Sequence, residues 1–255
     1  ECIEKKKDFT EGGARYRDDR NEIFAVVNVV NGLLAIKELC FETKKYTLKE
    51  YLEAVRNNWE GNEEMRIDAT RSLAWGDGNK ESSKLCARLN EDMDKMLKNI
   101  TGAYGGKVVL AHLAYTEVRW WGEVTRATPD GRKNGDYLAQ GLTPSRLTKI
   151  PYVTSVINSL NELDCSLFGG NSVINVILPS AKMTLESCEA FLRAAAKSSM
   201  QSLQLNCTSK QQLLDAQKHP EKYPDLIVRV TGFSAKFTSL SPEWQKEFLT
   251  RNFYE

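Results

Sequence analysis

The order of apolar and polar positions predicts helices and strands in alternation. From 23 to 41 an apolar run changes to helical spacing, which predicts a short buried strand or turn leading into a helix. Thr47–Glu50 has the form of a capping box, which is typical of a helix start. Leu52, Val55 and Trp59 follow at steps of three and four residues, so this helix is predicted to have one apolar face.

The second half of the chain continues the alternation. Thr184 and Thr208 precede helical patterns in the position of N-caps, and the pair Ser241–Pro242 is typical of a helix start. The pattern predicts helices over 82–99, 153–163, 184–200 and 208–220, strands over 172–179 and 203–207, and a strand-like or helical stretch over 108–115. Strands alternate with long helices and no internal repeat is present, so the predicted fold class is α/β.

An apolar run from 224 to 237 is broken by one glycine, Gly232. We interpret this run as a buried β-loop-β hairpin with Gly232 at its tip. A glycine inside a strand pattern usually marks a bulge or a backbone that another group approaches closely. Glycine also permits a third use, because loss of one Cα hydrogen leaves a planar carbon radical that no side chain hinders.

Three segments resemble the glycyl radical enzymes. Residues 229–237 read Arg-Val-Thr-Gly-Phe-Ser-Ala-Lys-Phe and match the family's pattern Arg-Val-x-Gly-(Phe/Tyr)-Ser-x-x-Phe, within a longer resemblance over 204–251. Residues 128–141 are similar to a second signature of the family, Thr-Pro-Asp-Gly-Arg-(Lys/Arg)-x-Gly-x-x-Leu-Ala-x-Gly. Residues 8–16 resemble a segment that lies well downstream of the family's catalytic Cys-x-Glu loop.

The resemblance implies a fold and a chemistry. It implies the C-terminal part of a ten-stranded α/β barrel over 1–200 and a glycyl radical domain over 201–255, with the hairpin inside the barrel. It implies a radical on Gly232, made by a radical S-adenosylmethionine activating enzyme. That radical would be relayed to a cysteine thiyl on a loop outside this chain. Such an enzyme is anaerobic and oxygen-sensitive.

Composition and charge narrow the possible partners. Thirty-five basic residues face 34 acidic ones without a long block of either sign, which argues against nucleic acid and anionic membranes. The six cysteines and two histidines have no metal-ligand spacing, so no metal is expected in the chain itself. We therefore expect a small-molecule substrate, a homo-oligomeric assembly and a cytoplasmic location.

The six cysteines differ in how well they fit the role of the thiyl-forming residue. Cys2 and Glu4 have the Cys-x-Glu form, but the register of residues 8–16 makes Cys2 structural. Cys40, Cys86 and Cys188 lie in helical patterns and are predicted to be small buried hydrophobes. The remaining two are Cys165, in a turn, and Cys207, at the end of a strand. The active cysteine is therefore expected outside this chain.

Two segments of the second half of the chain bear on the subfamily and its substrate. Residues 142–147, Leu-Thr-Pro-Ser-Arg-Leu, depart from the Ile-Ser-Pro stretch of many diol dehydratases, and the block 153–179 resembles arylacetate decarboxylases such as 4-hydroxyphenylacetate decarboxylase. A glycyl radical diol or hydroxyproline dehydratase is the alternative. A non-catalytic spare radical domain that restores a damaged partner is another alternative, although its known form is shorter and lacks the 128–141 signature.

The adjacent residues Trp120 and Trp121 either line a ligand pocket or fill the core.

Overall fold

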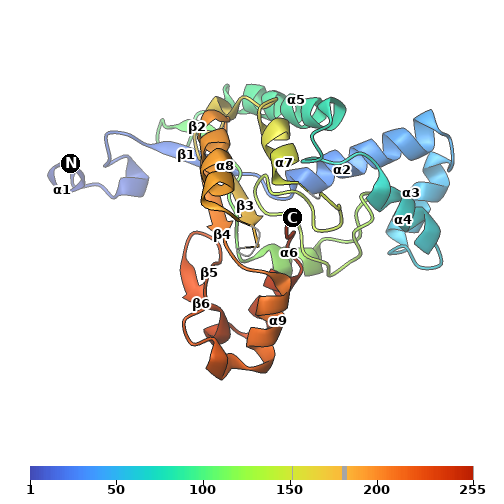
Figure 1. Ribbon diagram of the computed structural model, residues 1–255. Coiled ribbons are helices and arrows are strands. Elements are labelled where there is room, and N and C mark those ends of the chain that lie inside the picture. Colours follow the sequence, from blue (N-terminus) through green and yellow to red (C-terminus); the bar gives the residue numbers. More distant parts are fainter. Residues whose placement is uncertain (151, 180–182, 255) are drawn as a thin grey trace.

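The computed structural model describes residues 1–150, 152–179 and 183–254 (Figure 1). Its helices are α1 Cys2–Lys5, α2 Val26–Ile36, α3 Leu48–Arg56, α4 Glu63–Arg71, α5 Lys80–Leu97, α6 Val118–Val124, α7 Val153–Leu160, α8 Leu185–Lys197, α9 Lys210–Lys218 and α10 Pro242–Leu249. Its strands are β1 Asp18–Glu22, β2 Lys107–Ala111, β3 Val173–Ile177, β4 Ser202–Asn206, β5 Ile227–Arg229 and β6 Ser234–Lys236. Helices and strands alternate, as the predicted α/β class requires.

Parallel strands form one wall of the molecule. β1 pairs with β2 and β3 pairs with β4, both in parallel register. A bridge between His112 and Ser172 joins the two pairs: the N–H of His112 donates to the carbonyl of Asn171, and the N–H of Val173 donates to the carbonyl of His112, both at 2.9 Å. The strands therefore follow one another in the order β1, β2, β3, β4.

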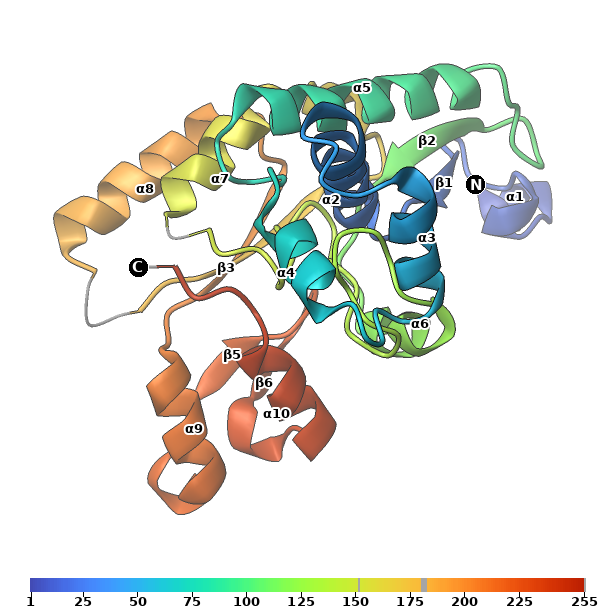
Figure 2. The ribbon, with the colours of Figure 1, turned by 90° about the vertical axis from the view of Figure 1, so that its right-hand side faces the viewer.

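The main core lies between this wall and the helices α2, α5 and α7. Figure 2 shows α5 along the top of the molecule with α7 and α8 beside it. All five residues of β3 are buried, which explains why four of them are apolar, since both faces of a covered parallel strand lie in the core. Buried members of this core include Leu110, Leu160, Ile174 and Val176.

Most predicted helix starts are correct. The capping box at Thr47 and Glu50 is formed, and Thr184 caps α8 in a similar exchange with Ser187. Two details are wrong. Ser209, not Thr208, caps α9, because its hydroxyl accepts from the N–H of Gln212. Trp59 lies beyond the end of α3 with a φ of 63°, yet it is buried at the same apolar face.

The residues after β4 form a separate lobe with its own core. The lobe contains α9, the β5–β6 hairpin and α10, and it hangs below the wall in both views (Figures 1 and 2). Its core is formed by Leu213, Ala216, Val228, Val230, Phe237 and Phe248, together with Ile177 of β3. β4 enters the lobe from the wall, so the proposed division at 200 and 201 falls just before a strand that both parts use.

The chain returns from the lobe to the strand from which it left. Ile177 at the end of β3 pairs with Asn206 of β4 and also bridges to Phe253. The N–H of Leu178 donates to the carbonyl of Asn206 at 2.9 Å, and the N–H of Tyr254 donates to the carbonyl of Ile177 at 3.0 Å. Consecutive residues of a strand point these groups to opposite edges, so the two neighbours flank β3 on either side.

Candidate functional site

Gly232 lies at the tip of a short antiparallel hairpin. β5 and β6 pair in the register Ile227–Lys236, Val228–Ala235 and Arg229–Ser234. The N–H of Val230 donates to the carbonyl of Phe233 at 2.8 Å and closes the turn. Gly232 has a φ of 72°, in the left-handed region that favours glycine. The predicted hairpin and its tip are confirmed.

The prediction that this hairpin is buried is only half correct. Val228 and Val230 are fully buried, whereas Gly232 is exposed and Phe233 is 50% exposed. The buried residues face the core of the lobe, and the tip projects beyond it. A Cβ placed on Gly232 would meet no atom within 4 Å. Within the described residues, the need for glycine at 232 therefore comes from the backbone angle and not from crowding.

Two amide side chains of β4 hold the hairpin. Asn206 makes a pair of contacts with the backbone of Arg229: its Oδ1 accepts from the N–H at 2.7 Å, and its Nδ2 donates to the carbonyl at 3.1 Å. Oε1 of Gln204 accepts from the N–H of Gly232 at 3.1 Å. Gln204 and Asn206 are both buried and alternate along the strand with Leu203 and Leu205, which pack against the main core, so both amides face the hairpin on the other side.

A buried group of three charges anchors the hairpin from the other side. Glu247 of α10 pairs with Arg146, from the 142–147 segment, and with Arg251, whose Nε lies 3.1 and 3.0 Å from the two carboxylate oxygens. Nη1 of Arg251 donates to the carbonyl of Val230 at 3.1 Å. The three charges therefore link a loop of the main body to the backbone two residues before Gly232.

The electrostatics of this group follow from its burial. Burial alone would raise the pKa of Glu247, but Arg146 and Arg251 outweigh it, so this pKa lies below its ordinary value. Burial lowers the pKa of Arg146. Sequence reasoning missed the group. The only signal was the spacing of Glu247 and Arg251 by four residues, which places them on one helix face, and this spacing is common on solvated helices.

Comparisons with known proteins decide the family. A family model described as pyruvate formate lyase-like matches residues 1–122, and a model described as glycine radical matches residues 138–238, which include the hairpin. The chain belongs to the glycyl radical enzyme family. The glycine radical match supports a glycyl radical as the cofactor, and the open, hydrogen-bonded turn at Gly232 fits that group.

Relatives with several activities match the whole chain. A probable dehydratase, YbiW, of Escherichia coli is 31% identical over 98% of this chain and 33% of its own length. The trans-4-hydroxy-L-proline dehydratase of Clostridioides difficile is 30% identical over 98% and 32%. The indoleacetate decarboxylase of Tractidigestivibacter scatoligenes is 30% identical over 100% and 32%. The chain thus spans about a third of the length of these relatives.

Solved structures of glycyl radical enzymes have the same fold. The glycerol-bound form of the B12-independent glycerol dehydratase from Clostridium butyricum has a TM-score of 0.89 at 30% identity, covering 99% of this chain and 33% of that one. The hydroxyproline dehydratase of C. difficile has a TM-score of 0.88 at 28% identity, covering 99% and 33%. The predicted fold, the C-terminal part of a glycyl radical enzyme, is confirmed.

The second glycyl radical enzyme signature, 128–141, is built into the interior. Arg132 is fully buried, and its guanidinium donates to the carbonyls of Gly122, Thr125, Arg126, Lys133 and Asp136 at 2.6 to 3.3 Å. Asp130 accepts from Thr128 and Asn28, and burial raises its pKa despite these bonds. These side chains are engaged with the protein itself, so the signature shapes the loop.

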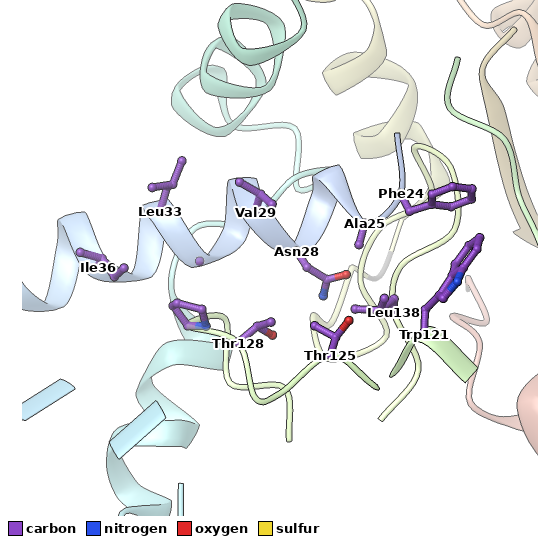
Figure 3. Close-up of a pocket in the computed structure, with 12 residues that line it drawn as sticks. Phe24, Ala25, Asn28, Val29, Leu33, Ile36, Trp121, Thr125, Thr128 and Leu138 are labelled. Carbon is purple, nitrogen blue, oxygen red and sulfur yellow. The ribbon is translucent and has the colours of Figure 1, made fainter. Parts of the chain in front are cut away.

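An apolar groove runs between α2 and this signature segment (Figure 3). It has a volume of about 510 Å³ and is lined by Phe24, Ala25, Asn28, Val29, Gly32, Leu33, Ile36, Trp121, Thr125, Thr128, Pro129 and Leu138. Trp121 packs on Phe24 with ring centroids 3.9 Å apart. Trp120 lines a neighbouring hollow and is 59% exposed. Neither tryptophan is thus a buried core residue and each lines a different hollow, while binding of a ligand there stays a prediction.

The cysteines differ from expectation in part. Cys86 is fully buried, and burial raises its pKa to about 12, but Cys40 and Cys188 are only half-buried because their helix faces lie at the edge of the core. Cys165 is buried and Cys207 is exposed. Cys2 lies in α1 against the backbone of Gly13, well apart from the hairpin in Figures 1 and 2. None of these six thiols lies in a hydrogen bond with the hairpin.

The described residues contain neither a metal-binding cluster nor a membrane-spanning helix. The part of the chain that the structure describes contains no group of three or more His, Cys, Asp or Glu side chains that could hold a metal ion. No helix in the described ranges is long and apolar enough to cross a membrane.

Proposed function

We propose that this chain stores a radical on Gly232 for a glycyl radical enzyme of which it forms about a third. The uninterrupted match of 229–237 to the family signature, placed at an exposed hairpin tip, is the observation that carries the proposal. When present, the radical supplies a stored one-electron oxidant. The activating partner is a radical S-adenosylmethionine enzyme, which takes one hydrogen atom from the Cα of Gly232.

The residues of this chain would place and protect that carbon. The turn presents the Cα with no side chain over it, while Gln204, Asn206 and Arg251 hold its backbone from two sides. The hydrogen-bonded backbone limits the motion of the tip, and the activator reaches the Cα from the exposed side. The cysteine that receives the radical equivalent lies outside this chain, together with most of the substrate pocket.

Two reactions are candidates. Decarboxylation of an arylacetate is supported by the Ser145–Arg146 variant after Pro144 and by the indoleacetate decarboxylase that matches all of this chain. Dehydration of a diol or of hydroxyproline is supported by the other relatives and by the dehydratase structures. A spare radical domain is a weaker candidate, because the pyruvate formate lyase-like match over 1–122 extends far beyond such a domain.

Electron paramagnetic resonance tests radical storage directly. The complete enzyme is activated without oxygen by its radical S-adenosylmethionine partner, and a doublet from the single remaining Cα hydrogen is expected. Gly232→Ala should lose the doublet, because the alanine methyl group clashes with the flanking carbonyls of a planar radical and disfavours a φ of 72°. Gly135→Ala, in an exposed turn with a φ of 86°, is the matched control and should keep it. A full doublet in Gly232→Ala would contradict the proposal.

Substrate trials separate the two reactions. The activated enzyme is supplied with 4-hydroxyphenylacetate, indoleacetate, glycerol, propane-1,2-diol and trans-4-hydroxyproline in parallel, and the products are identified by mass spectrometry. Carbon dioxide from an arylacetate supports the decarboxylase, and loss of water from a diol or hydroxyproline supports the dehydratase.

A further inference from the structure

Gln204 is the one described side chain that hydrogen-bonds the amide of Gly232. It is 7% exposed, although Gly232 itself is exposed, so the amide reaches the tip from the buried side. Its position on β4 is fixed by the parallel pairing with β3, in which Gln204 lies opposite Asn175. A side chain on a paired strand is held more firmly than one on a loop, which suits it to orient another group.

The hairpin does not need this contact to close. Its register is set by three strand pairs and by the bond from Val230 to Phe233. Its attachment to β4 is provided by the two bonds of Asn206 to Arg229, and Arg251 holds the carbonyl of Val230. The bond of Gln204 falls two residues beyond Val230, on the residue whose Cα would react. A purely structural role is therefore already filled by Asn206 and Arg251.

The chemistry of a backbone radical gives this bond a purpose. An unpaired electron on Cα is shared with the amide nitrogen on one side and the carbonyl on the other, provided that all three groups stay in one plane. An acceptor on the N–H fixes the rotation of that amide and increases the electron density on nitrogen, which strengthens the sharing. Oε1 of Gln204, 3.1 Å from this nitrogen, is placed to do both.

We propose that Gln204 is the positioning residue of the radical site, holding the Gly232 amide so that a radical on its Cα is delocalised and preserved. This role rests on the proposed storage of the radical at Gly232. No bond is made or broken at Gln204, which acts only through its hydrogen bond.

The test compares side chains of similar size with and without an acceptor. Gln204→Met and Gln204→Leu remove the acceptor, and two such variants ensure that the result does not depend on one of them folding. Gln204→Glu keeps an oxygen at the same position. Gln217→Leu is the control, because this glutamine is exposed and its amide contacts Gln245 of the same lobe, away from the tip.

The first measurement needs no activation. Hydrogen exchange of the Gly232 amide is measured in the 255-residue chain, and the Met and Leu variants should exchange about fivefold faster, the change that corresponds to one hydrogen bond of about 1 kcal/mol. The Glu variant and the Gln217→Leu control should exchange as the original chain does. Unchanged exchange in the Met and Leu variants would overturn the role of Gln204.

The second measurement reads the radical itself in the complete, activated enzyme. Electron-nuclear double resonance in H2O and D2O isolates the coupling of the Gly232 amide proton, which should shift in Gln204→Met and return towards the original value in Gln204→Glu. The doublet of the Met variant should also decay faster under anaerobic conditions. A normal doublet with an unchanged coupling and decay in Gln204→Met overturns this role alone. Absence of any doublet in the unsubstituted enzyme overturns the proposed storage and this role with it.

Discussion

At Gly232 the backbone conformation, and not the surrounding atoms, excludes a side chain. An L-residue in the left-handed region costs roughly 1 to 2 kcal/mol, whereas the space around the tip would admit a methyl group. The same openness leaves the Cα accessible to a partner and to small gases. This accessibility makes oxygen a reporter of the site.

Exposure to air should cleave an activated chain at Gly232. Dioxygen adds to a carbon radical, and the backbone then breaks at that residue. Intact-mass analysis should find a large fragment ending near 231 and a short peptide from the remainder, with Gly232 at or beside the new end. Protein that was never activated is the control and should stay whole in air. An activated chain that also stays whole would show that Gly232 carried no radical.

The environment of Gly232 shows what the sequence can predict at this scale. The signature locates the glycine and the turn, because both depend on neighbouring residues. Gln204, which accepts from the Gly232 amide, lies 28 residues before the glycine, and Arg251, which donates to the carbonyl of Val230, lies 19 residues after it. Their contacts depend on how the lobe folds back on β4, and a local sequence pattern does not predict such long-range packing.

At the scale of single elements, α10 depends on the buried carboxylate of Glu247. Glu247→Gln leaves the charges of Arg146 and Arg251 buried without a counter-ion, so the free energy of unfolding should fall by about 3 kcal/mol. Urea denaturation measures this change. Glu243→Gln, exposed in the first turn of the same helix, is the matched control and should stay within about 0.5 kcal/mol. Equal effects in the two variants would contradict the role of the buried group.

The junction of β2 and β3 should make stability depend on pH through His112. The His112 imidazole is fully buried, contacts the side chain of Asn90 and packs on Phe168. Burial lowers its pKa to about 4. The unfolded chain, with a histidine pKa of about 6.5, binds the proton first as the pH falls. Stability is therefore complete above about pH 6.5 and declines as the pH falls towards 4, by roughly 3 kcal/mol in total.

Urea denaturation between pH 7 and pH 4 measures this dependence. His112→Gln should flatten the curve between these limits, whatever its effect at pH 7. His219→Gln is the control for the substitution itself, since the other histidine of the sequence lies exposed at the end of α9. An identical slope in His112→Gln would show that another group titrates.

The strands differ in how well they could be predicted. β3 is apolar except for Asn175, and the predicted strand 172–179 matches it within one or two residues at each end. β1, Asp-Asp-Arg-Asn-Glu, carries no strand signal, because charged and amide residues are depleted in strands. It forms a strand because β2 offers it a parallel partner, and Arg17 pairs with Asp19 at its start. Tertiary pairing here overrides local preference.

At the scale of the whole molecule, the chain is expected to be catalytically silent by itself. Cys2 and Cys40 have the Cys-x-Glu form, but Cys2 lies in α1 apart from the hairpin, and Cys40 is half-buried in the helical segment Lys37–Glu42. The other four cysteines lack that form. Residues 1–255 should convert neither an arylacetate nor a diol, even with Gly232 activated, until the remainder of the enzyme is supplied. Product formation measured by mass spectrometry checks this expectation.

The complete enzyme provides the control for that expectation. Cys2→Ser in the complete enzyme should keep both turnover and the glycyl doublet. Loss of turnover with an intact doublet would instead make Cys2 and Glu4 the active pair, and the register inferred from residues 8–16 would then be wrong.

The lobe leaves and re-enters the wall at one residue, Ile177, with Asn206 on one edge of β3 and Phe253 on the other. Neighbouring strands are about 5 Å apart, so the two junctions are separated by only about 10 Å. Residues 207–252 therefore form a closed loop with a narrow neck, comparable to an inserted cassette. Exchange of this segment between related proteins at the two cuts should keep the register of the wall, whereas its deletion would leave Arg146 buried without the carboxylate of Glu247.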